Sequence, residues 1–222
     1  MGVEKKAAYY NKKFTLQDEY RDNYKNSWYY VQWTQIIQLL KKIENPQILE
    51  IGCATGQLAQ YLYDQNYQNY NGFDFSEVAV EHAKKYIPQI FFVGNALDAK
   101  NYNLNYNTVI CTEVLEHIKE DIKVIKNIKV NTSIIFSIPN FDEISHVRWF
   151  TSERQIKKRY YRVINIEQII QVGNIYIVKG IRSDFHPNSI QKILASREQI
   201  NTQSIIKRVK HKVKNIFKLK FI

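Results

Sequence analysis

The chain has 222 residues, of which 45% are hydrophobic, and it carries a formal net charge of +11. This length suits one domain with a large buried core, and no apolar run is long enough to span a bilayer. Residues 1–6 lack the apolar stretch of a secretory signal, so we expect a cytoplasmic protein with two reduced, buried cysteines, Cys53 and Cys111.

The first segment, residues 1–45, is rich in tyrosine and tryptophan, and apolar residues at helical spacing predict a helix over residues 28–43. Aromatic rings with a polar end cover a ligand and still form hydrogen bonds. The segment therefore suits a lid over a cofactor crevice, with Tyr10 and Tyr20 as contacts. Ordinary packing accounts for the same composition equally well.

An apolar run over residues 47–51 leads into a small-residue turn, residues 52–56, and a helix is expected over residues 57–64. Glycine adopts positive φ and has no Cβ, so a ligand is able to lie against the backbone of such a turn. The N–H groups at the start of the helix add partial positive charge. This pattern predicts a site for a nucleotide-type cofactor, although the turn lacks the full G-x-G-x-x-G of nicotinamide dehydrogenases.

A second apolar run ends at Asp74, 24 residues after Glu50. A doubly wound fold places its ribose-binding carboxylate at about this spacing, and a carboxylate accepts hydrogen bonds from both ribose hydroxyls. Asp74 also suits the N-cap of the helix expected over residues 76–86, as does Ser76. The register with the preceding turn favours the ribose role for Asp74.

The remaining elements continue the alternation of strands and helices, and they end in a hairpin signal at Gly173-Asn174. This order predicts an α/β fold with a mostly parallel sheet whose last strand runs antiparallel. Strands are expected over residues 90–93, 108–112, 133–138, 162–171 and 174–181, with helices over residues 120–127 and from 151 to about 160.

The segment after the fourth strand carries Glu113, Glu116 and His117. If a helix begins at Glu113, these side chains share one helix face, and His146 from the next loop completes a candidate set of ligands for a divalent cation. A solvated helix start is the alternative. His117 and His146 are also the candidate catalytic bases, because neutral imidazole accepts a proton near physiological pH.

These segments resemble, in the correct order, five motifs of the class I S-adenosylmethionine-dependent methyltransferases. The resemblance spans residues 46–182 and implies a Rossmann-like, seven-stranded sheet with helices on both faces. It includes a subgroup signature written PN…HxRxFT, and the matching segments are residues 50–56, 74–75, 94–97, 109–118 and 137–151.

The resemblance also implies which residues bind S-adenosylmethionine, with Asp74 on the ribose hydroxyls and Phe75 against adenine. The expected cofactor contacts are Glu50, Gly52, Ala54, Gly56, Asp74, Phe75, Asn95, Ala96 and Thr112. The Glu-x-x-Glu-His set with a later histidine resembles the metal site of small-RNA 3′-terminal 2′-O-methyltransferases. The VLEH segment, residues 114–117, also occurs in many related proteins without a known metal, so cation binding stays open. Arg148 is a candidate for orienting an anionic substrate, or for a structural salt bridge.

The last segment, residues 186–222, differs from the core of residues 46–185. Residues 199–222 contain seven basic residues and no acidic one, and apolar residues at helical spacing predict a basic amphipathic helix over residues 205–222. Such a helix suits an anionic membrane surface, a phosphate backbone or a protein partner. The membrane surface is favoured over nucleic acid, because the core shows no RNA-binding module.

Three functions follow from these observations. The first is a cytoplasmic methyltransferase that acts on an oxygen of a small molecule or a saccharide intermediate, at the inner face of the membrane. The second is a metal-assisted RNA 2′-O-methyltransferase, and the third is a non-catalytic cofactor-binding or interaction protein. A fold alone does not separate them.

Overall fold

A computed structural model describes residues 2–85, 87 and 90–184. Within this part, the aromatic N-terminal segment and the predicted core form one compact unit. The predicted basic helix over residues 205–222 lies outside the described residues. Among the described helices, none combines the length and apolar character needed to cross a bilayer.

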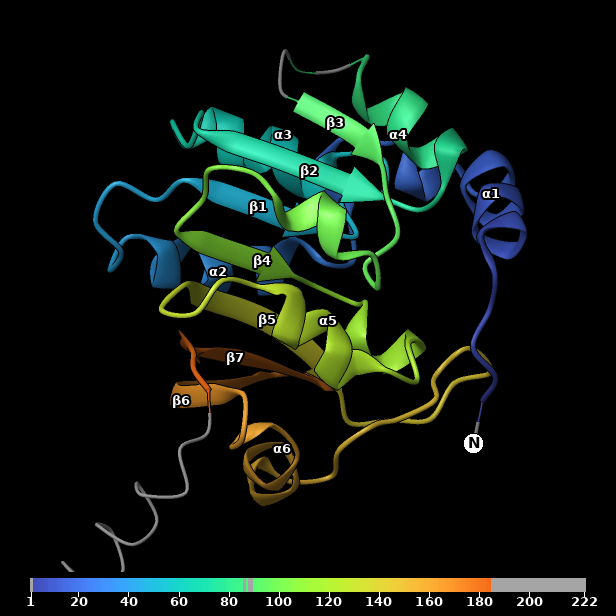
Figure 1. Cartoon of the computed structure of the whole chain (residues 1–222). Coiled ribbons are helices and arrows are strands. Elements are labelled where there is room, and N and C mark those ends of the chain that lie inside the picture. Colours follow the sequence, from blue (N-terminus) through green and yellow to red (C-terminus); the bar gives the residue numbers. More distant parts are fainter. Residues whose placement is uncertain (1, 86, 88–89, 185–222) are drawn as a thin grey trace, which may run out of the picture. The chain divides into compact units, whose positions relative to one another are not determined.

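The unit is built on one seven-stranded sheet with the order β3-β2-β1-β4-β5-β7-β6 (Figure 1). Strands β1 to β5 are parallel to one another, whereas β7 runs antiparallel to both β5 and β6. This confirms the predicted mostly parallel sheet with an antiparallel last strand. The strands are β1 (Ile48–Ile51), β2 (Tyr70–Asp74), β3 (Ile90–Val93), β4 (Thr108–Cys111), β5 (Ser133–Pro139), β6 (Ile164–Val172) and β7 (Ile175–Arg182).

Helices cover both faces of the sheet, as Figure 1 shows. Alternate residues of the strands face opposite sides, so Ile48 packs with one set of helices while its neighbour Leu49 packs with the other. The first set is α2 (Tyr30–Leu40), α3 (Gln57–Asp64) and α4 (Glu77–Ala83), and the second is η3 (Ala99–Tyr102), α5 (Asp121–Asn127) and α6 (Glu153–Tyr160). Cys53 and Cys111 are buried and unpaired, as predicted.

Helix α2 is shorter than the predicted helix over residues 28–43. Trp28 lies before its first residue and is 82% exposed, so this ring adds nothing to the buried face of the helix. The chain leaves the helix at Lys41 and turns through Ile43, whose N–H bonds the carbonyl of Leu40.

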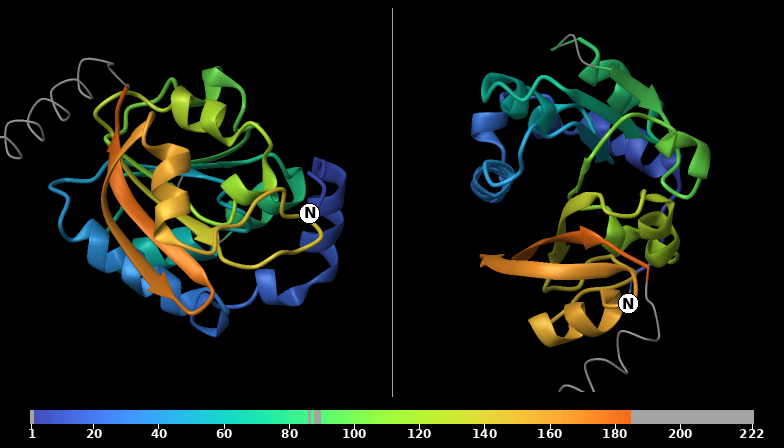
Figure 2. Two further views of the ribbon diagram at one scale, coloured as in Figure 1. Left: turned by 90° about the horizontal axis from the view of Figure 1, so that it is seen from below. Right: turned by 60° about the vertical axis from the view of Figure 1, so that its left-hand side comes forward.

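The N-terminal segment crosses the carboxyl edge of the sheet. The N–H groups of Gly2 and Val3 bond the carbonyls of His146 and Ile144, which places the N-terminus beside the loop that follows β5 (Figure 2). From there the chain forms α1 (Ala7–Leu16), η1 (Asp18–Tyr20) and η2 (Tyr24–Asn26) before it enters α2.

The position of β1 decides where a ligand binds. This strand lies between β2 and β4, where the direction of strand crossover reverses. In open parallel sheets, ligands bind outside the carboxyl ends of the strands at this reversal. The turn after Ile51, the acid Asp74 and the residues after Cys111 therefore meet at one edge.

Candidate active site

The turn after β1 has the backbone that its glycines predict. Gly52, Ala54 and Gly56 all have positive φ, at 75°, 46° and 83°. A Cβ on Gly52 would collide with the side chain of Val114 from the loop after β4. The backbone N–H of Ala54 donates a 3.0 Å hydrogen bond to Asp74 Oδ2 at the end of β2. This hydrogen bond thus joins the turn after β1 to the end of β2.

A cavity of about 200 Å³ lies over this turn. It is lined by eight of the nine predicted cofactor contacts, and these are Glu50, Gly52, Ala54, Asp74, Phe75, Asn95, Ala96 and Thr112. Gly56 does not line it. A Cβ there would lie 3.0 Å from Ala83 Cβ, so Gly56 instead permits close packing between α3 and α4.

Two buried carboxyl groups stand at the deep side of the cavity. Burial raises the pKa of Asp74 to about 6, although hydrogen bonds from the N–H groups of Ser76 and Ala54 lower it. Burial also raises the pKa of Glu50 to about 8, against a 2.5 Å hydrogen bond from the Tyr70 hydroxyl that lowers it. Ser76 Oγ caps α4, so the residue that caps this helix and the acid that faces the cavity are different.

The predicted adenine end consists of Phe75 and the loop after β3. Asn95 Oδ1 accepts a hydrogen bond from the N–H of Leu97, and the carbonyl of Ala96 accepts one from the Tyr102 hydroxyl. The amide of Asn95 therefore stabilises its own loop. Its predicted contact with adenine stays a prediction.

Side chains of the aromatic N-terminal segment, called the lid below, line this cavity. Tyr10 packs against Phe75 and against His117, with ring centroids 5.2 and 5.8 Å apart. The other residues of α1, η1 and α2 that line the cavity are Lys13, Phe14, Tyr20 and Trp33, and Tyr29, the residue before α2, also lines it. Sequence reasoning named Tyr10 and Tyr20 but missed Lys13 and Phe14.

The lid is held to the cofactor turn by side chains that donate to lid carbonyls. Thr55 Oγ1 donates to the carbonyl of Tyr20. Gln57 Nε2 donates to the carbonyls of Glu19 and Asp22, at 2.9 and 2.8 Å. These bonds hold the main chain of residues 19–22 against the turn after β1 and the start of α3.

The expected helix beginning at Glu113 is wrong. Glu113 has φ 55°, and the short helix η4 covers only Leu115–His117. The N–H of Glu113 bonds Ser137 Oγ at 2.8 Å, and the Ser137 hydroxyl donates to Glu113 Oε1 at 2.7 Å. Contacts with β5 thus hold Glu113 in a left-handed turn, so it does not share a helix face with Glu116 and His117.

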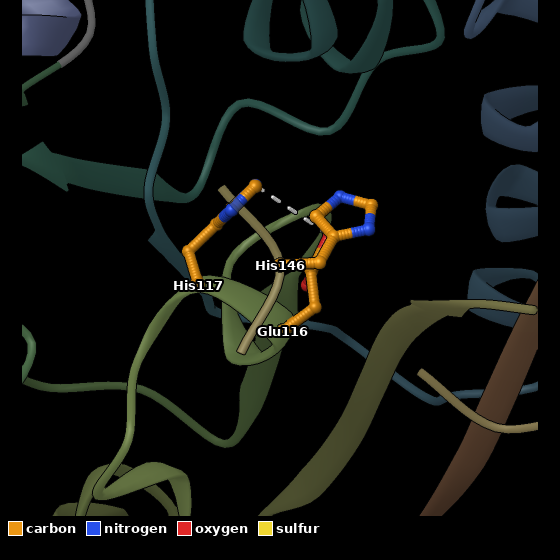
Figure 3. A group of neighbouring side chains, drawn as sticks. All are labelled: Glu116, His117 and His146. Carbon is orange, nitrogen blue, oxygen red and sulfur yellow. Dashed lines mark ion pairs between the residues drawn. The ribbon is translucent and has the colours of Figure 1, made fainter. Parts of the chain in front are cut away.

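The other three candidate metal ligands do converge (Figure 3). Ligand atoms of Glu116, His117 and His146 lie within 4.8 Å of one another. Each imidazole is oriented by a carbonyl, because His117 Nδ1 lies 3.0 Å from the oxygen of Ser145 and His146 Nδ1 lies 3.2 Å from that of Phe141. This leaves Nε2 of His117 on the side of Glu116, 3.8 Å from Oε1.

The cluster is buried and incompletely bonded. Glu116 is fully buried, and neither of its carboxyl oxygens has a hydrogen-bond partner in the described part of the chain. Burial and the nearby charge of Glu113 raise its pKa well above the usual value. Burial lowers the pKa of His117 to about 4, so this imidazole is neutral at physiological pH.

Arg148 stabilises the segment that carries Glu116 and His117. Its guanidinium donates to the carbonyls of Leu115, Ile118 and Lys119, and it pairs with Asp121 at 3.3 Å. This geometry matches the structural alternative for Arg148. Its predicted contact with an anionic substrate gains no support.

The residues around the cavity suit S-adenosylmethionine. A buried carboxylate at Asp74 suits the ribose diol, the ring of Phe75 suits a flat base, and the turn at Gly52 presents bare backbone. At physiological pH the carboxyl group of Asp74, with a pKa of about 6, is largely ionised, whereas that of Glu50, with a pKa of about 8, holds its proton.

A family model described as a methyltransferase domain matches residues 26–173. The Ubiquinone biosynthesis O-methyltransferase of Hydrogenovibrio crunogenus (strain DSM 25203 / XCL-2) is 22% identical over 187 residues, which cover 75% of this chain and 77% of that protein. A SAM-dependent methyltransferase from Aquifex aeolicus has a similar structure, with a TM-score of 0.57 and 11% identity over 80% of this chain and 99% of the other. The magnesium protoporphyrin IX methyltransferase from Synechocystis PCC 6803, solved with bound SAH, has a TM-score of 0.54 and 18% identity over 68% of this chain and 82% of the other. The chain belongs to the methyltransferase domain family and is an S-adenosylmethionine-dependent methyltransferase.

Proposed function

We propose that this enzyme transfers a methyl group to a hydroxyl oxygen of a small molecule. The observation that carries the proposal is the orientation of His117. Its Nδ1 is held by the carbonyl of Ser145, its pKa is lowered to about 4 by burial, and the residue lines the cofactor cavity. Nε2 is therefore unprotonated at physiological pH and is available to accept a hydroxyl proton.

The remaining residues act by positioning. Bound S-adenosylmethionine supplies a methyl group that its sulfonium cation already activates. Asp74 and the turn at Gly52 fix the cofactor end of the cavity, while the lid residues Tyr10 and Phe14 exclude water above it. The predicted second base, His146, is buried, and its Nε2 lies 3.3 Å from Glu143 Oε2.

The relatives support an oxygen acceptor. The Hydrogenovibrio crunogenus protein is named as an O-methyltransferase of ubiquinone biosynthesis. The PN…HxRxFT segment resembles that of methyltransferases linked to cell-surface glycan synthesis. Both resemblances favour a hydroxylated small molecule, including a saccharide intermediate.

The test is transfer of a labelled methyl group to a panel of hydroxylated, amino and thiol compounds. We expect labelled methyl ethers, with His117→Ala slowing transfer by about 10²-fold or more. The matched control is His82→Ala, which removes a histidine of α4 that does not line the cavity. Label on nitrogen or sulfur alone, or a His117→Ala variant with full activity, would overturn the proposal.

A divalent cation site is a second candidate, favoured by the unpartnered carboxyl group of Glu116. This group would bind the cation together with Nε2 of His117 and His146, because both Nδ1 atoms already contact carbonyls. Such an ion would hold acceptor hydroxyls and ease their deprotonation. The four-ligand set of the RNA 2′-O-methyltransferase alternative also includes Glu113, which lies outside this cluster.

Titration calorimetry of Mn²⁺ into chelator-treated protein tests this candidate. We expect one ion per chain, bound about tenfold or more weaker by Glu116→Gln. Glu120→Gln, an exposed acid of the same segment, is the control. An unmodified protein that binds no ion, or a Glu116→Gln variant that binds as well as the unmodified protein, would remove the metal-assisted mechanism.

The basic segment 205–222 leads to a proposal about location. Its seven positive charges and apolar spacing suit the anionic inner face of a membrane. Sedimentation with anionic but not neutral vesicles, lost when residues 205–222 are removed, is the expected result. Equal sedimentation with both kinds of vesicle would contradict an electrostatic attraction.

A further inference from the structure

The helices on the two faces of the sheet differ in charge. On one face, the segments that carry α2, α3 and α4 hold four lysines and four acids, and these segments are residues 30–45, 57–64 and 76–85. On the other face, the segments that carry α5 and α6 hold nine basic residues and three acids, and they are residues 119–129 and 152–162. We call these last two segments the basic face.

The exposed side of α5 continues a row of lysines that begins just before the helix. Lys119, Lys123 and Lys126 recur at i, i+4 and i+7, and all three are exposed. Val124 and Ile125 of the same helix are buried in the core. One side of α5 therefore packs on the sheet, while the opposite side presents ammonium groups to solvent.

Helix α6 has the same division. Arg154, Lys157 and Lys158 are exposed, whereas Ile156 and Tyr160 are buried in the same core cluster as the apolar side of α5. The polar side of α6 thus adds further positive charge to the same face of the sheet.

The two helices are joined by the carboxyl group of Asp121, the first residue of α5. This buried group accepts hydrogen bonds from Arg159 Nη2 at 2.5 Å and from the Tyr160 hydroxyl at 2.9 Å, and both donors belong to α6. The exposed cations of α5 and α6 therefore form one continuous surface rather than two separate patches.

Acids of the chain neutralise only part of this charge. Lys157 pairs with Glu153 at 2.9 Å. Lys123, Lys126 and Lys158, in contrast, make no ion pair with any of the residues that the structure describes. Like charges on one surface repel each other, so an anionic partner is attracted to this face and stabilises it.

The described chain ends beside the basic face. Arg182, the last residue of β7, donates from Nε to the carbonyl of Ile125 in α5 at 2.8 Å, and its own carbonyl accepts a hydrogen bond from the N–H of Asn131. The chain that continues to the basic segment 205–222 therefore leaves the compact unit on its basic side.

An anionic membrane fits this surface better than single-stranded nucleic acid does. Bases of a single strand bind by stacking on aromatic side chains. The exposed aromatic ring of the basic face is that of Tyr161, and the Arg162 guanidinium already lies over it, 5.5 Å from the centroid. Anionic lipid headgroups require only exposed positive charge, which α5 and α6 present.

We propose that the basic face binds the anionic surface of a membrane, as a second contact besides segment 205–222. The inference goes beyond the proposed methyl transfer and holds whichever acceptor is methylated. Because the face begins at Lys119, two residues after His117, this contact brings the loop that carries the proposed base toward the lipid headgroups.

Sedimentation of the full chain with vesicles of equal parts phosphatidylglycerol and phosphatidylcholine tests the proposal. A variant that combines Lys123→Gln, Lys126→Gln and Lys158→Gln should lower the partition coefficient by about a hundredfold, because each lysine near such a surface contributes about fivefold. The loss should occur although residues 205–222 are intact. Binding of the unmodified protein should also weaken as the salt concentration rises.

The matched control combines Lys41→Gln, Lys42→Gln and Lys85→Gln, which removes the same charge from exposed lysines of the opposite face. Its partition coefficient should stay within about threefold of that of the unmodified protein. Both variants should keep the melting temperature of the unmodified protein, because the substituted lysines are exposed. Equal weakening by the two variants would show an effect of net charge alone and would overturn the proposal.

Two further outcomes also decide against it. Full binding by the basic-face variant, with binding lost when residues 205–222 are removed, would overturn this inference and leave the membrane role of that segment intact. Tighter binding of a single-stranded oligonucleotide than of vesicles, lost in the basic-face variant, would assign the face to nucleic acid instead.

Discussion

Asp74 and Ala54 are joined by a hydrogen bond from the Ala54 N–H to Asp74 Oδ2, so the acid at the end of β2 supports the turn after β1. The same carboxyl group accepts a 2.8 Å bond from the N–H of Ser76. One side chain thus fixes two backbone segments while it faces the cofactor cavity. Changes at Asp74 should affect both the turn and the predicted contact with the ribose.

Cofactor binding should depend on pH through Asp74. Its pKa of about 6 lies above the usual value, so the ionised form, which we expect to accept hydrogen bonds from the ribose hydroxyls, is lost as the pH falls below about 6. The affinity for S-adenosylhomocysteine should be constant above pH 7 and fall by about tenfold per pH unit below 6. Calorimetry across this range measures the effect. Asp74→Asn should bind weakly with a flat profile, and an equally steep profile in this variant would assign the proton to another group.

Glu50→Gln should stabilise the ligand-free protein at high pH. Burial raises the pKa of Glu50 to about 8 in the folded state, so the carboxyl group holds its proton there while the unfolded chain loses it above about 4.5. The unfolding free energy of the unmodified protein therefore decreases as the pH rises from about 4.5 to 8, and a neutral amide avoids this loss. Thermal unfolding at pH 5 and pH 9 should show similar melting temperatures at pH 5 and a higher one for Glu50→Gln at pH 9. A lower melting temperature for the variant at pH 9 would show that the Tyr70 hydrogen bond dominates.

Gly52→Ala should lose cofactor binding and stability together. Its φ of 75° disfavours any side chain, and a Cβ would collide with Val114. We expect a loss of about 2 kcal/mol in unfolding free energy, measured by urea denaturation. Adding Val114→Ala should recover the part of the lost unfolding free energy that is due to the collision. The part that is due to the positive φ should remain. No recovery in the double variant would mean that backbone strain alone accounts for the loss.

Arg148→Met should reduce stability by about 2 kcal/mol, because it leaves the carbonyls of Leu115 and Ile118 without their donor. Asp121 keeps its bonds from Arg159 and Tyr160, which limits the loss. The affinity for S-adenosylhomocysteine should stay within about threefold, since Arg148 does not line the cavity. An unchanged unfolding free energy with impaired methyl transfer would instead support the predicted substrate contact.

The sheet and the cofactor wall could be predicted because their signals are local. Alternation, strand-ending acids and the turn at residues 52–56 each lie within a few residues, and the spacing from Glu50 to Asp74 follows from one helix between two strands. Gly56 was assigned to the cofactor because the motif includes it. Its contact with Ala83 depends on how α4 packs, which no local pattern contains.

The part of the site around Glu113 and Arg148 was harder to predict, because contacts with residues distant in the sequence determine its conformation. The positive φ of Glu113 depends on Ser137, 24 residues away, which bonds both its N–H and its carboxyl group. Arg148 bonds carbonyls about 30 residues earlier in the chain. The sequence motifs predict that Glu113 and Arg148 lie near the site. The contacts that orient these side chains form only when β4 and β5 lie side by side.

The bonds from Thr55 and Gln57 to the main chain of the lid have a kinetic consequence. The N-terminal segment that lines the cavity is hydrogen-bonded to the turn after β1, so we expect opening of these bonds to ease the release of spent cofactor. We therefore expect the residence time of S-adenosylhomocysteine to depend on local opening of residues 19–22 as well as on its own contacts. Weakening this fastening should speed product release even where it leaves methyl transfer itself unchanged.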